Sequence, residues 1–410
     1  MKNLVGKWAG FGLVLWALSA PAISGPRVLA PAGVTIRGTL PVPCPARVKP
    51  APPREEWVGL PGDYTLEDVS VRVLERDGRL VLVSLAGGTP PAPGGPAPGS
   101  PAVTHPPSAG PGSEKAKETP GRKKGERVPP PRFTGEFLLE DAGKGRFRLR
   151  MPGAFQPMEV KFRRDRRGLA AECLLGEAVF TRHFLGPESG GSFRITPRRP
   201  VEDLRREAAA ATPPVETGAF ATPDWVDAEK FVPHVRLDIR YATPDNFVGA
   251  SFYPAARAFL QRPVTEALAR AARRFEVHGL GLIIHDAYRP WSVTKMFWDA
   301  TPDHQREFVA DPARGSRHNR GTAVDVSLYD LSTGKPVPFP SGYDEFSPRA
   351  AVDYTGGTGL ERWNRDLLRC VLETEGFKVY EAEWWHFDYQ APKPYPIAND
   401  TFEALDARGH

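Results

Sequence analysis

The sequence predicts a small all-β domain, followed by an α+β domain in which a small antiparallel sheet is flanked by helices. Two observations carry this prediction. Short stretches of alternating apolar and polar residues, separated by turn residues, fill 62–185. After residue 221, stretches with apolar residues at helical spacing alternate with short apolar runs that are typical of buried strands.

Composition and charge indicate a folded chain with long irregular segments. Of the 410 residues, 40% are hydrophobic and 25% are charged, but 45 prolines and 40 glycines exceed what compact domains usually hold. The length is compatible with two or three domains. The net charge is +5 and no basic stripe with interleaved aromatic residues occurs, so we expect no nucleic-acid partner.

The first residues are typical of a secretory signal, with two lysines followed by an apolar run that is too short to cross a bilayer. We therefore expect export, to the periplasm or the extracellular space, and no transmembrane helix after signal removal. The expected order is a signal peptide (1–22), an extended segment (23–61), a β-rich accessory domain (62–195) interrupted by disorder (87–131), a linker (196–220) and the α+β domain (221–410).

The β-rich half is predicted from alternation and turns. Residues 69–74 and 80–83 alternate around Asp77-Gly78, a dipeptide typical of a hairpin turn, and the pattern suits a small antiparallel barrel or sandwich. Residues 87–131 have almost nothing apolar to bury, which predicts disorder. The basic run at 122–124 fits a solvated loop or a contact with an anionic polymer of the cell wall.

The second half alternates between strands and helices. A charged helix is also expected at 198–211, inside the linker. The expected strands are 235–241, 280–285, 323–328 and 377–389, and the expected helices are 264–278, 293–297 and 360–375.

Three cysteines could take part in a disulfide if the chain is exported. Cys44 and Cys173 both belong to the first half, so we expect them to pair in preference to Cys370. Cys370 falls within a helical pattern and is expected to be a small core residue. None of the three has the spacing of a thiolate zinc site.

Two distant stretches of the second half supply the residue types of a zinc site. Residues 316–325 contribute His318 and Asp325, and Glu-Trp-Trp-His at 383–386 contributes His386. Two imidazoles and one carboxylate form a three-ligand set that suits a catalytic zinc, which keeps its fourth position for water. Either stretch alone is typical of unrelated loop or strand residues, but their combination in one domain predicts a zinc site.

Glu383 lies beside a ligand without being needed as one, so we expect it to act as the general base. Glu383 and His386 are three positions apart, which in a straight strand would place them on opposite faces. We therefore expect a bulge at Trp384 and Trp385. We also expect these two tryptophans to form the dry wall of the site. His285 is expected in the core or behind the ligands.

The pattern Ser-x-His-x-x-Gly-x-Ala-x-Asp, followed by Glu-x-Trp-His, resembles the zinc D-alanyl-D-alanine dipeptidases. Asp-Ala-Tyr-Arg-Pro at 286–290 is similar to the arginine motif of that family, and Gly-Tyr-Asp at 342–344 is similar to a substrate motif. The resemblance covers about 224–395 and not the first half of the chain. It implies an α+β zinc peptidase that cleaves D-Ala-D-Ala or a similar small peptide of peptidoglycan metabolism.

The resemblance also implies roles for three further residues. Arg289 would stabilise the oxyanion that forms when water attacks a peptide carbonyl. Asp344 would bind the ammonium group of a free dipeptide, and Ser316 would lie near the substrate termini.

Two alternatives remain open from the sequence. The chain could be a cell-wall D,D- or L,D-carboxypeptidase or endopeptidase of the same fold, with an open cleft. It could also be a non-catalytic wall-binding module, although Glu383 and Arg289 together with a complete ligand set argue against this.

Overall fold

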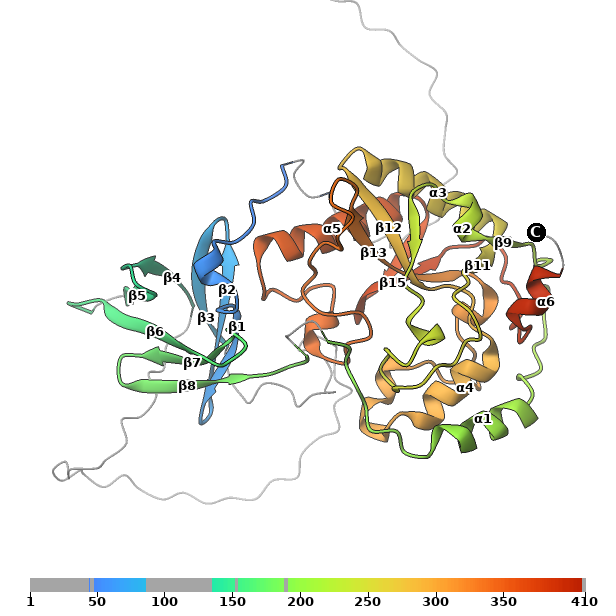
Figure 1. Cartoon of the computed structure of the whole chain (residues 1–410), viewed down its shortest axis with the longest axis horizontal. Helices are drawn as coiled ribbons and strands as arrows, with labels where there is room; N and C mark the ends of the chain where they lie inside the picture. Colours follow the sequence, from blue (N-terminus) through green and yellow to red (C-terminus); the bar gives the residue numbers. More distant parts are fainter. Residues whose placement is uncertain (1–43, 45–47, 86–134, 152–153, 188–190, 408–410) are drawn as a thin grey trace, which may run out of the picture. The chain divides into compact units, whose positions relative to one another are not determined.

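The computed structural model describes residues 44, 48–85, 135–151, 154–187 and 191–407. These residues form an all-β part and an α+β part (Figure 1). The predicted signal peptide, the disorder expected at 87–131 and the basic run at 122–124 lie outside the described residues.

The all-β part is a closed antiparallel barrel of eight strands, in which each strand pairs with the next and β8 pairs with β1. The structure therefore confirms the all-β prediction and selects a barrel over a sandwich. At the predicted hairpin, Asp77 and Gly78 both have positive φ, which a two-residue turn requires. The strands are β1 (Gly62–Leu66), β2 (Val69–Arg76), β3 (Arg79–Leu85), β4 (Glu136–Asp141), β5 (Arg146–Leu149), β6 (Met158–Arg164), β7 (Ala170–Leu175) and β8 (Ala178–His183).

The α+β part is built on a five-stranded sheet. In spatial order its strands are β10 (Val235–Leu237), β12 (Leu280–Asp286), β13 (Ala323–Asp330), β15 (Glu383–Tyr389) and β14 (Phe377–Tyr380). Four of them pair antiparallel as predicted, but β10 runs parallel to β12. The expectation of a purely antiparallel sheet is therefore wrong. A helix lies between β10 and β12 in the chain, and such a crossover connection returns the second strand in the same direction.

Helices pack against this sheet, α3 against β12 and α5 against β14. No helix among the described residues is both long and apolar enough to cross a bilayer. The helices are α1 (Val201–Ala210), α2 (Ala228–Phe231), α3 (Arg262–Glu276), α4 (Trp291–Ala300), α5 (Gly359–Thr374) and α6 (Phe402–Asp406). The 3-10 turns are η1 (Glu55–Trp57), η2 (Arg240–Ala242), η3 (Asp303–Phe308), η4 (His318–Arg320) and η5 (Pro348–Ala350), and β9 (Trp225–Asp227) pairs with β11 (Phe259–Gln261).

Two predicted strands differ from the structure. The stretch 377–389 is a hairpin of β14 and β15, because the chain reverses after Tyr380 and pairs with itself. The stretch 235–241 ends as a strand at Leu237, and Tyr241 lies in the following 3-10 turn, where it is buried.

Helix α1, expected within a linker, contributes to the core of the α+β part. Its side chains Leu204 and Ala208 are buried in the same hydrophobic cluster as residues of the central sheet, and the helix packs against α4. The charged face of α1 remains exposed, which explains why its sequence alone suggested a linker.

The expected pairing of Cys44 with Cys173 is wrong. Cys44 forms a disulfide with Cys370 on α5, with the two Cα atoms 5.2 Å apart. Cys173 is a free thiol in the barrel core, fully buried among apolar side chains. Nearness in the sequence favoured the wrong partner, since the fold brings together cysteines 326 positions apart.

A second link to α5 comes from β2 of the barrel. The carboxylate of Glu75 accepts a hydrogen bond from the backbone N–H of Gly359 (2.5 Å), the first residue of α5. The helix also carries a capping box formed by Thr358 and Glu361. An acid at a helix N-terminus is favoured by the helix dipole, so Glu75 stabilises the start of α5.

We expect reduction of the Cys44–Cys370 bond to lower the free energy of unfolding by about 2–4 kcal/mol, because the bond closes a long loop in the unfolded chain. The measurement is thermal or urea unfolding with and without a thiol reductant. The double variant Cys44→Ser/Cys370→Ser serves as the control, because the reductant should not destabilise it further. Equal stability of the oxidised and reduced wild type would contradict the prediction.

Candidate metal centre

His318 reaches the site from a tight turn. It opens η4, which ends at Gly321 in the left-handed conformation (φ 63°). A side chain at Gly321 would be strained by this φ, and its Cβ would lie 2.3 Å from the ring of Trp225. Glycine therefore allows the chain to turn directly from His318 into β13, as the motif predicted.

Asp325 and His386 face each other across two strands. Asp325 on β13 is the register partner of His386 on β15. The antiparallel pairing of the two strands therefore places these two side chains next to each other. Between β14 and β15 the register jumps, with Tyr380 opposite Glu383 and Val379 opposite Phe387. The predicted bulge is therefore confirmed.

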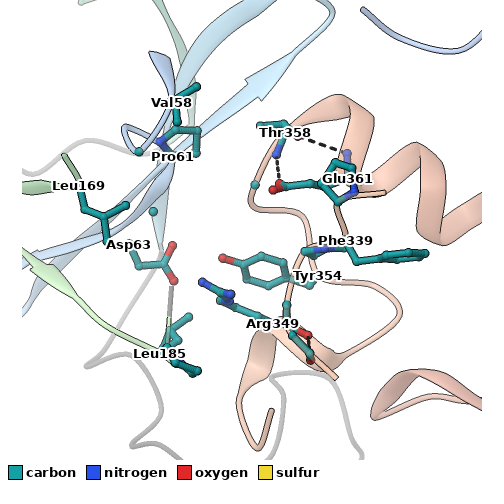
Figure 2. Close-up of a pocket in the computed structure, with 18 of the residues that line it drawn as sticks. Val58, Pro61, Asp63, Leu169, Leu185, Phe339, Arg349, Tyr354, Thr358 and Glu361 are labelled. Carbon is teal, nitrogen blue, oxygen red and sulfur yellow. Dashed lines mark hydrogen bonds between the residues drawn. The ribbon is translucent and has the colours of Figure 1, made fainter. Parts of the chain in front are cut away.

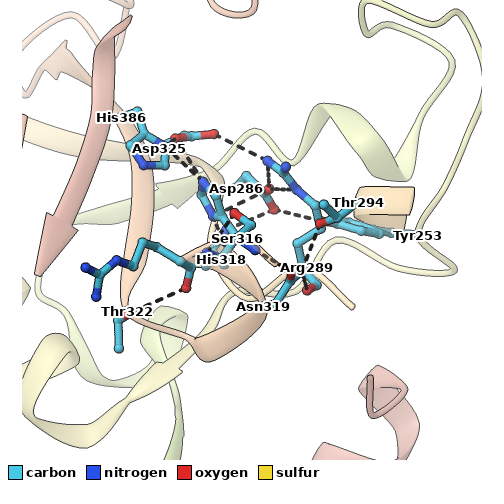
Figure 3. Close-up of polar contacts among 12 residues, drawn as sticks. Tyr253, Asp286, Arg289, Thr294, Ser316, His318, Asn319, Thr322, Asp325 and His386 are labelled. Carbon is cyan, nitrogen blue, oxygen red and sulfur yellow. Dashed lines mark hydrogen bonds and ion pairs between the residues drawn. The ribbon is translucent and has the colours of Figure 1, made fainter. Parts of the chain in front are cut away.

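The three side chains offer a compact set of metal-binding atoms (Figure 3). Nε2 of His318 lies 3.1 Å from Nδ1 of His386, and Oδ1 of Asp325 lies 3.3 Å and 3.0 Å from these two nitrogens. Ligands held at about 2.0–2.1 Å from a tetrahedral zinc are separated from one another by about 3.3–3.4 Å. The residues present thus fit a metal ion of this type.

Each histidine has an oxygen acceptor on the ring nitrogen that faces away from the ligand set, which favours the tautomer that metal binding needs. Nδ1 of His318 donates to the carbonyl oxygen of Ala287 (2.6 Å), which leaves the lone pair of Nε2 free. Nε2 of His386 lies 3.1 Å from Oδ1 of Asp388 and donates to it, so Nδ1 is the nitrogen that faces Asp325 and His318. No role for Asp388 was predicted from the sequence, although its position two residues after His386 on the expected strand is a usable signal.

Glu383 lies at the start of β15, with Oε2 4.0 Å from Nδ1 of His386. Burial raises the pKa of Glu383 to about 7; the nearby His386 opposes this shift and the charge of Asp325 adds to it. A carboxyl group with a pKa near neutrality can both accept and return a proton, which is what a general base in hydrolysis has to do.

Arg289 is held by a buried acid that the sequence analysis did not single out. Asp286, at the end of β12, accepts from Nε of Arg289 (2.9 Å), lies 2.8 Å from its Nη2 and accepts from the hydroxyl of Tyr253 (2.8 Å). Nη2 of Arg289 is 4.0 Å from Oδ2 of Asp325. The guanidinium therefore borders the ligand set in a fixed orientation (Figure 3).

Asp344 is buried and its Oδ2 has no hydrogen-bond partner among the described residues. Burial and the negative charge of Asp325 raise the pKa of Asp344 well above its ordinary value. Its backbone is left-handed (φ 58°), a conformation that aspartate tolerates better than most residues. Ser316 is also buried, and its hydroxyl accepts from the backbone N–H of His318 (3.2 Å).

All seven predicted site residues line one cavity of about 260 Å³. The set consists of Arg289, Ser316, His318, Asp325, Asp344, Glu383 and His386. Trp384 and Trp385 are buried but do not line it, so the expectation that they form its wall is wrong. They pack behind it instead, where Trp384 stacks on Phe339 with ring centroids 4.0 Å apart.

A larger cavity of about 470 Å³ contains none of these residues (Figure 2). Asp63 and Arg349 both border it, but each already has a partner. Asp63 pairs with Arg72 (2.6 Å), and Arg349 pairs with Glu345 (3.0 Å). These two charged groups are thus paired within the protein, and we assign the cavity no chemistry.

Two imidazoles, a carboxylate and a neighbouring glutamate in one small cavity define the site of a metallopeptidase. Residues 221–404 match the model of peptidase family M15, D-Ala-D-Ala dipeptidase. The chain is similar to D-alanyl-D-alanine dipeptidases of Escherichia coli strain K12 (34% identity over 188 residues, 46% of this chain and 96% of the relative) and Enterococcus faecium (33% over 186 residues, 41% and 92%).

A third such relative, from Enterococcus faecalis, is 34% identical over 189 residues, which cover 41% of this chain and 90% of the relative. The chain therefore belongs to the D-Ala-D-Ala dipeptidase family M15, whose members are metallopeptidases. The barrel strands β1–β8 lie outside the matched range.

Glu383→Gln should reduce kcat at least about 100-fold while the protein still binds one zinc ion, because a general base is lost and no ligand is removed. His386→Ala should lose both the metal and the activity, because two remaining ligands hold zinc poorly. Metal content and dipeptide hydrolysis of the purified variants test both expectations. Loss of zinc from Glu383→Gln would make Glu383 a ligand.

Activity should fall as the pH decreases through the pKa of Glu383, because only the deprotonated carboxylate can accept a proton. That pKa is raised from 4.5 to about 7 by burial, and a bound cation would lower it again. The acid limb of kcat/KM should therefore lie between these two values. Zinc content measured at each pH controls for metal loss. A profile that stays flat from about pH 4 to about pH 8 would contradict this role.

Proposed function

We propose that the chain is a zinc-dependent dipeptidase that hydrolyses free D-alanyl-D-alanine or a closely related dipeptide. The observation that carries the proposal is the buried Asp344 in the same small cavity as the ligand set. The volume of about 260 Å³ lies below the range of about 300–1,000 Å³ that is usual for drug-sized ligands, so a small substrate suits it.

The zinc ion would be held by His318, Asp325 and His386. When bound, it supplies a Lewis acid that polarises the scissile carbonyl and acidifies a water molecule. Membership of a metallopeptidase family and the 3.0–3.3 Å separations of the ligand atoms support this assignment.

The protein's own groups carry the proton transfers. The Glu383 carboxylate accepts a proton from the attacking water and then donates it to the nitrogen of the departing amino acid. Arg289, oriented by Asp286, directs its guanidinium toward the developing oxyanion. Since Asp286 balances its charge, Arg289 can remain in the buried site before substrate arrives.

Asp344 would select for a free amino group. Burial and the nearby charge of Asp325 make the charged form of Asp344 unfavourable, which its raised pKa reflects, and Oδ2 has no hydrogen-bond partner among the described residues. A substrate ammonium would pair with this oxygen and restore the balance of charge. A longer peptide, whose residue at this position has an amide in place of an ammonium, could not make this ion pair. The proposed role of Ser316 is to line the part of the cavity that receives the substrate termini, as its burial there allows.

We also propose that the protein is exported to the periplasm or the extracellular space. The Cys44–Cys370 disulfide supports this, because such bonds persist in oxidising compartments. In that location the substrate would be a dipeptide released from peptidoglycan, and contact with the cell wall would follow from the location.

Zinc-loaded protein should cleave free D-Ala-D-Ala, and its N-acetylated form should react at least about 100-fold more slowly, because the Asp344–ammonium pair is lost. The measurement is kcat/KM for both substrates. Asp344→Asn should lose most of this discrimination by slowing the free dipeptide.

Zinc content and the unfolding temperature of Asp344→Asn serve as controls for the integrity of the site. Equal rates on the free and acetylated dipeptides in the wild type would contradict the dipeptidase proposal. That outcome would favour the cell-wall carboxypeptidase or endopeptidase.

A further inference from the structure

Tyr343 contacts Asp325, one of the three proposed metal ligands, but has no part in the proposed function. Its hydroxyl donates a hydrogen bond to Oδ2 of Asp325 (3.1 Å). The other oxygen of the same carboxylate, Oδ1, is the one that lies 3.0 Å from His386 and 3.3 Å from His318. The tyrosine therefore occupies the oxygen that the histidines do not face and leaves Oδ1 for the metal.

The ring of Tyr343 is clamped from two sides. It stacks on the imidazole of His285, with centroids 4.6 Å apart and planes 16° from parallel, and it meets the ring of Trp385 edge-on at 5.6 Å. Tyr343 itself is 9% exposed. A ring packed in this way has one orientation available, so its hydroxyl is directed at a fixed point.

His285 is in turn anchored to the strand that carries Asp325. Its Nε2 lies 2.7 Å from Oγ of Ser327, and its Nδ1 lies 3.3 Å from Oδ2 of Asp238. Ser327 is two residues after Asp325 on β13, so the two side chains point to the same face of the sheet. The metal ligand Asp325 and Ser327, which anchors His285, thus share one strand.

Tyr343 also precedes Asp344 in the chain. Asp344 has positive φ, a conformation that persists only where the surroundings impose it. Because the clamped ring fixes the position of Tyr343, it limits where the next residue can place its carboxylate. One side chain therefore connects the metal ligand Asp325 with the proposed ammonium-binding residue.

We propose that Tyr343 is a positioning residue which holds Asp325 as a one-oxygen ligand and thereby sets the affinity for zinc, and that His285 supports it by stacking. The inference rests on the proposed zinc site but not on the identity of the dipeptide. His285 is placed behind the ligands by this arrangement, where the sequence analysis expected it.

Tyr343→Phe removes the hydroxyl and retains the ring. We expect its dissociation constant for zinc to rise about tenfold or more, as is usual when a hydrogen bond behind a metal ligand is lost. Competition with a chromophoric chelator measures the affinity. The visible absorption spectrum of the cobalt-substituted protein should also change, because the coordination of Asp325 changes.

Tyr329→Phe is the matched control. Tyr329 lies on β13, the strand that carries Asp325, and is 5% exposed. Its hydroxyl donates to the backbone oxygen of His234 at 3.1 Å, the same distance as in the Tyr343 contact. This variant loses a buried tyrosine hydroxyl away from the ligands, so it should bind zinc as the wild type does. If Tyr343→Phe and Tyr329→Phe both bind zinc with wild-type affinity and give the wild-type cobalt spectrum, the inference is overturned.

The stack is tested by His285→Ala and His285→Phe. The alanine variant removes the surface on which Tyr343 rests and should weaken zinc binding several-fold, whereas the phenylalanine variant keeps a flat ring and should retain more of the affinity. If His285→Ala and His285→Phe bind zinc with the same affinity as each other, the supporting role of His285 is overturned. Failure of the wild type to bind zinc would instead refute the proposed function.

Discussion

The site depends on holding three electron-rich atoms closer together than they would remain without support. Nε2 of His318, Nδ1 of His386 and Oδ1 of Asp325 lie within 3.3 Å of one another. Each ligand has a second contact on its far side, to the backbone of Ala287, to Asp388 and to the hydroxyl of Tyr343, respectively. These outer contacts set the tautomers and the carboxylate orientation, so the protein is already organised for a cation.

Charge is the second constraint on this cavity. Asp286, Asp325 and Asp344 are buried and the Glu383 side chain is 13% exposed, and these four acids lie near the buried guanidinium of Arg289. Burial raises the pKa of Glu383 to about 7 and raises that of Asp344 well above its ordinary value. A divalent cation and a substrate ammonium are the two charges that complement this surplus of acids. The same imbalance of charge therefore favours the proposed occupants.

The first half of the chain bears on the second through α5. The barrel residue Glu75 binds the N-terminus of this helix, and Cys44 is bonded to Cys370 within it. Helix α5 packs against β14 and also contacts β13, which carries Asp325, and β15, which carries Glu383 and His386. None of the described barrel residues lines the cavity, but the links from Glu75 and Cys44 stabilise a helix on which the geometry of the ligands depends.

Local patterns in the sequence determined the nature of the site and most of the elements around it. Helical and strand periodicity predicted α3, α4, α5, β12 and β13, since these patterns reflect which faces are buried. The spacing of residues 316–325 and 383–386 predicted the ligands and the bulge, because small residues and a three-residue step constrain the backbone locally.

Only the tertiary structure decided which distant residues meet. The parallel pairing of β10, the partner of Cys44 and the contacts of Asp388 and Tyr343 depend on how strands are ordered and how side chains pack. Such contacts leave no periodic trace in one sequence, because the residues are chosen for shape and hydrogen bonding at a single place in the fold. The sequence by itself therefore determined the chemistry of this protein, and the fold decided how rigidly that chemistry is held.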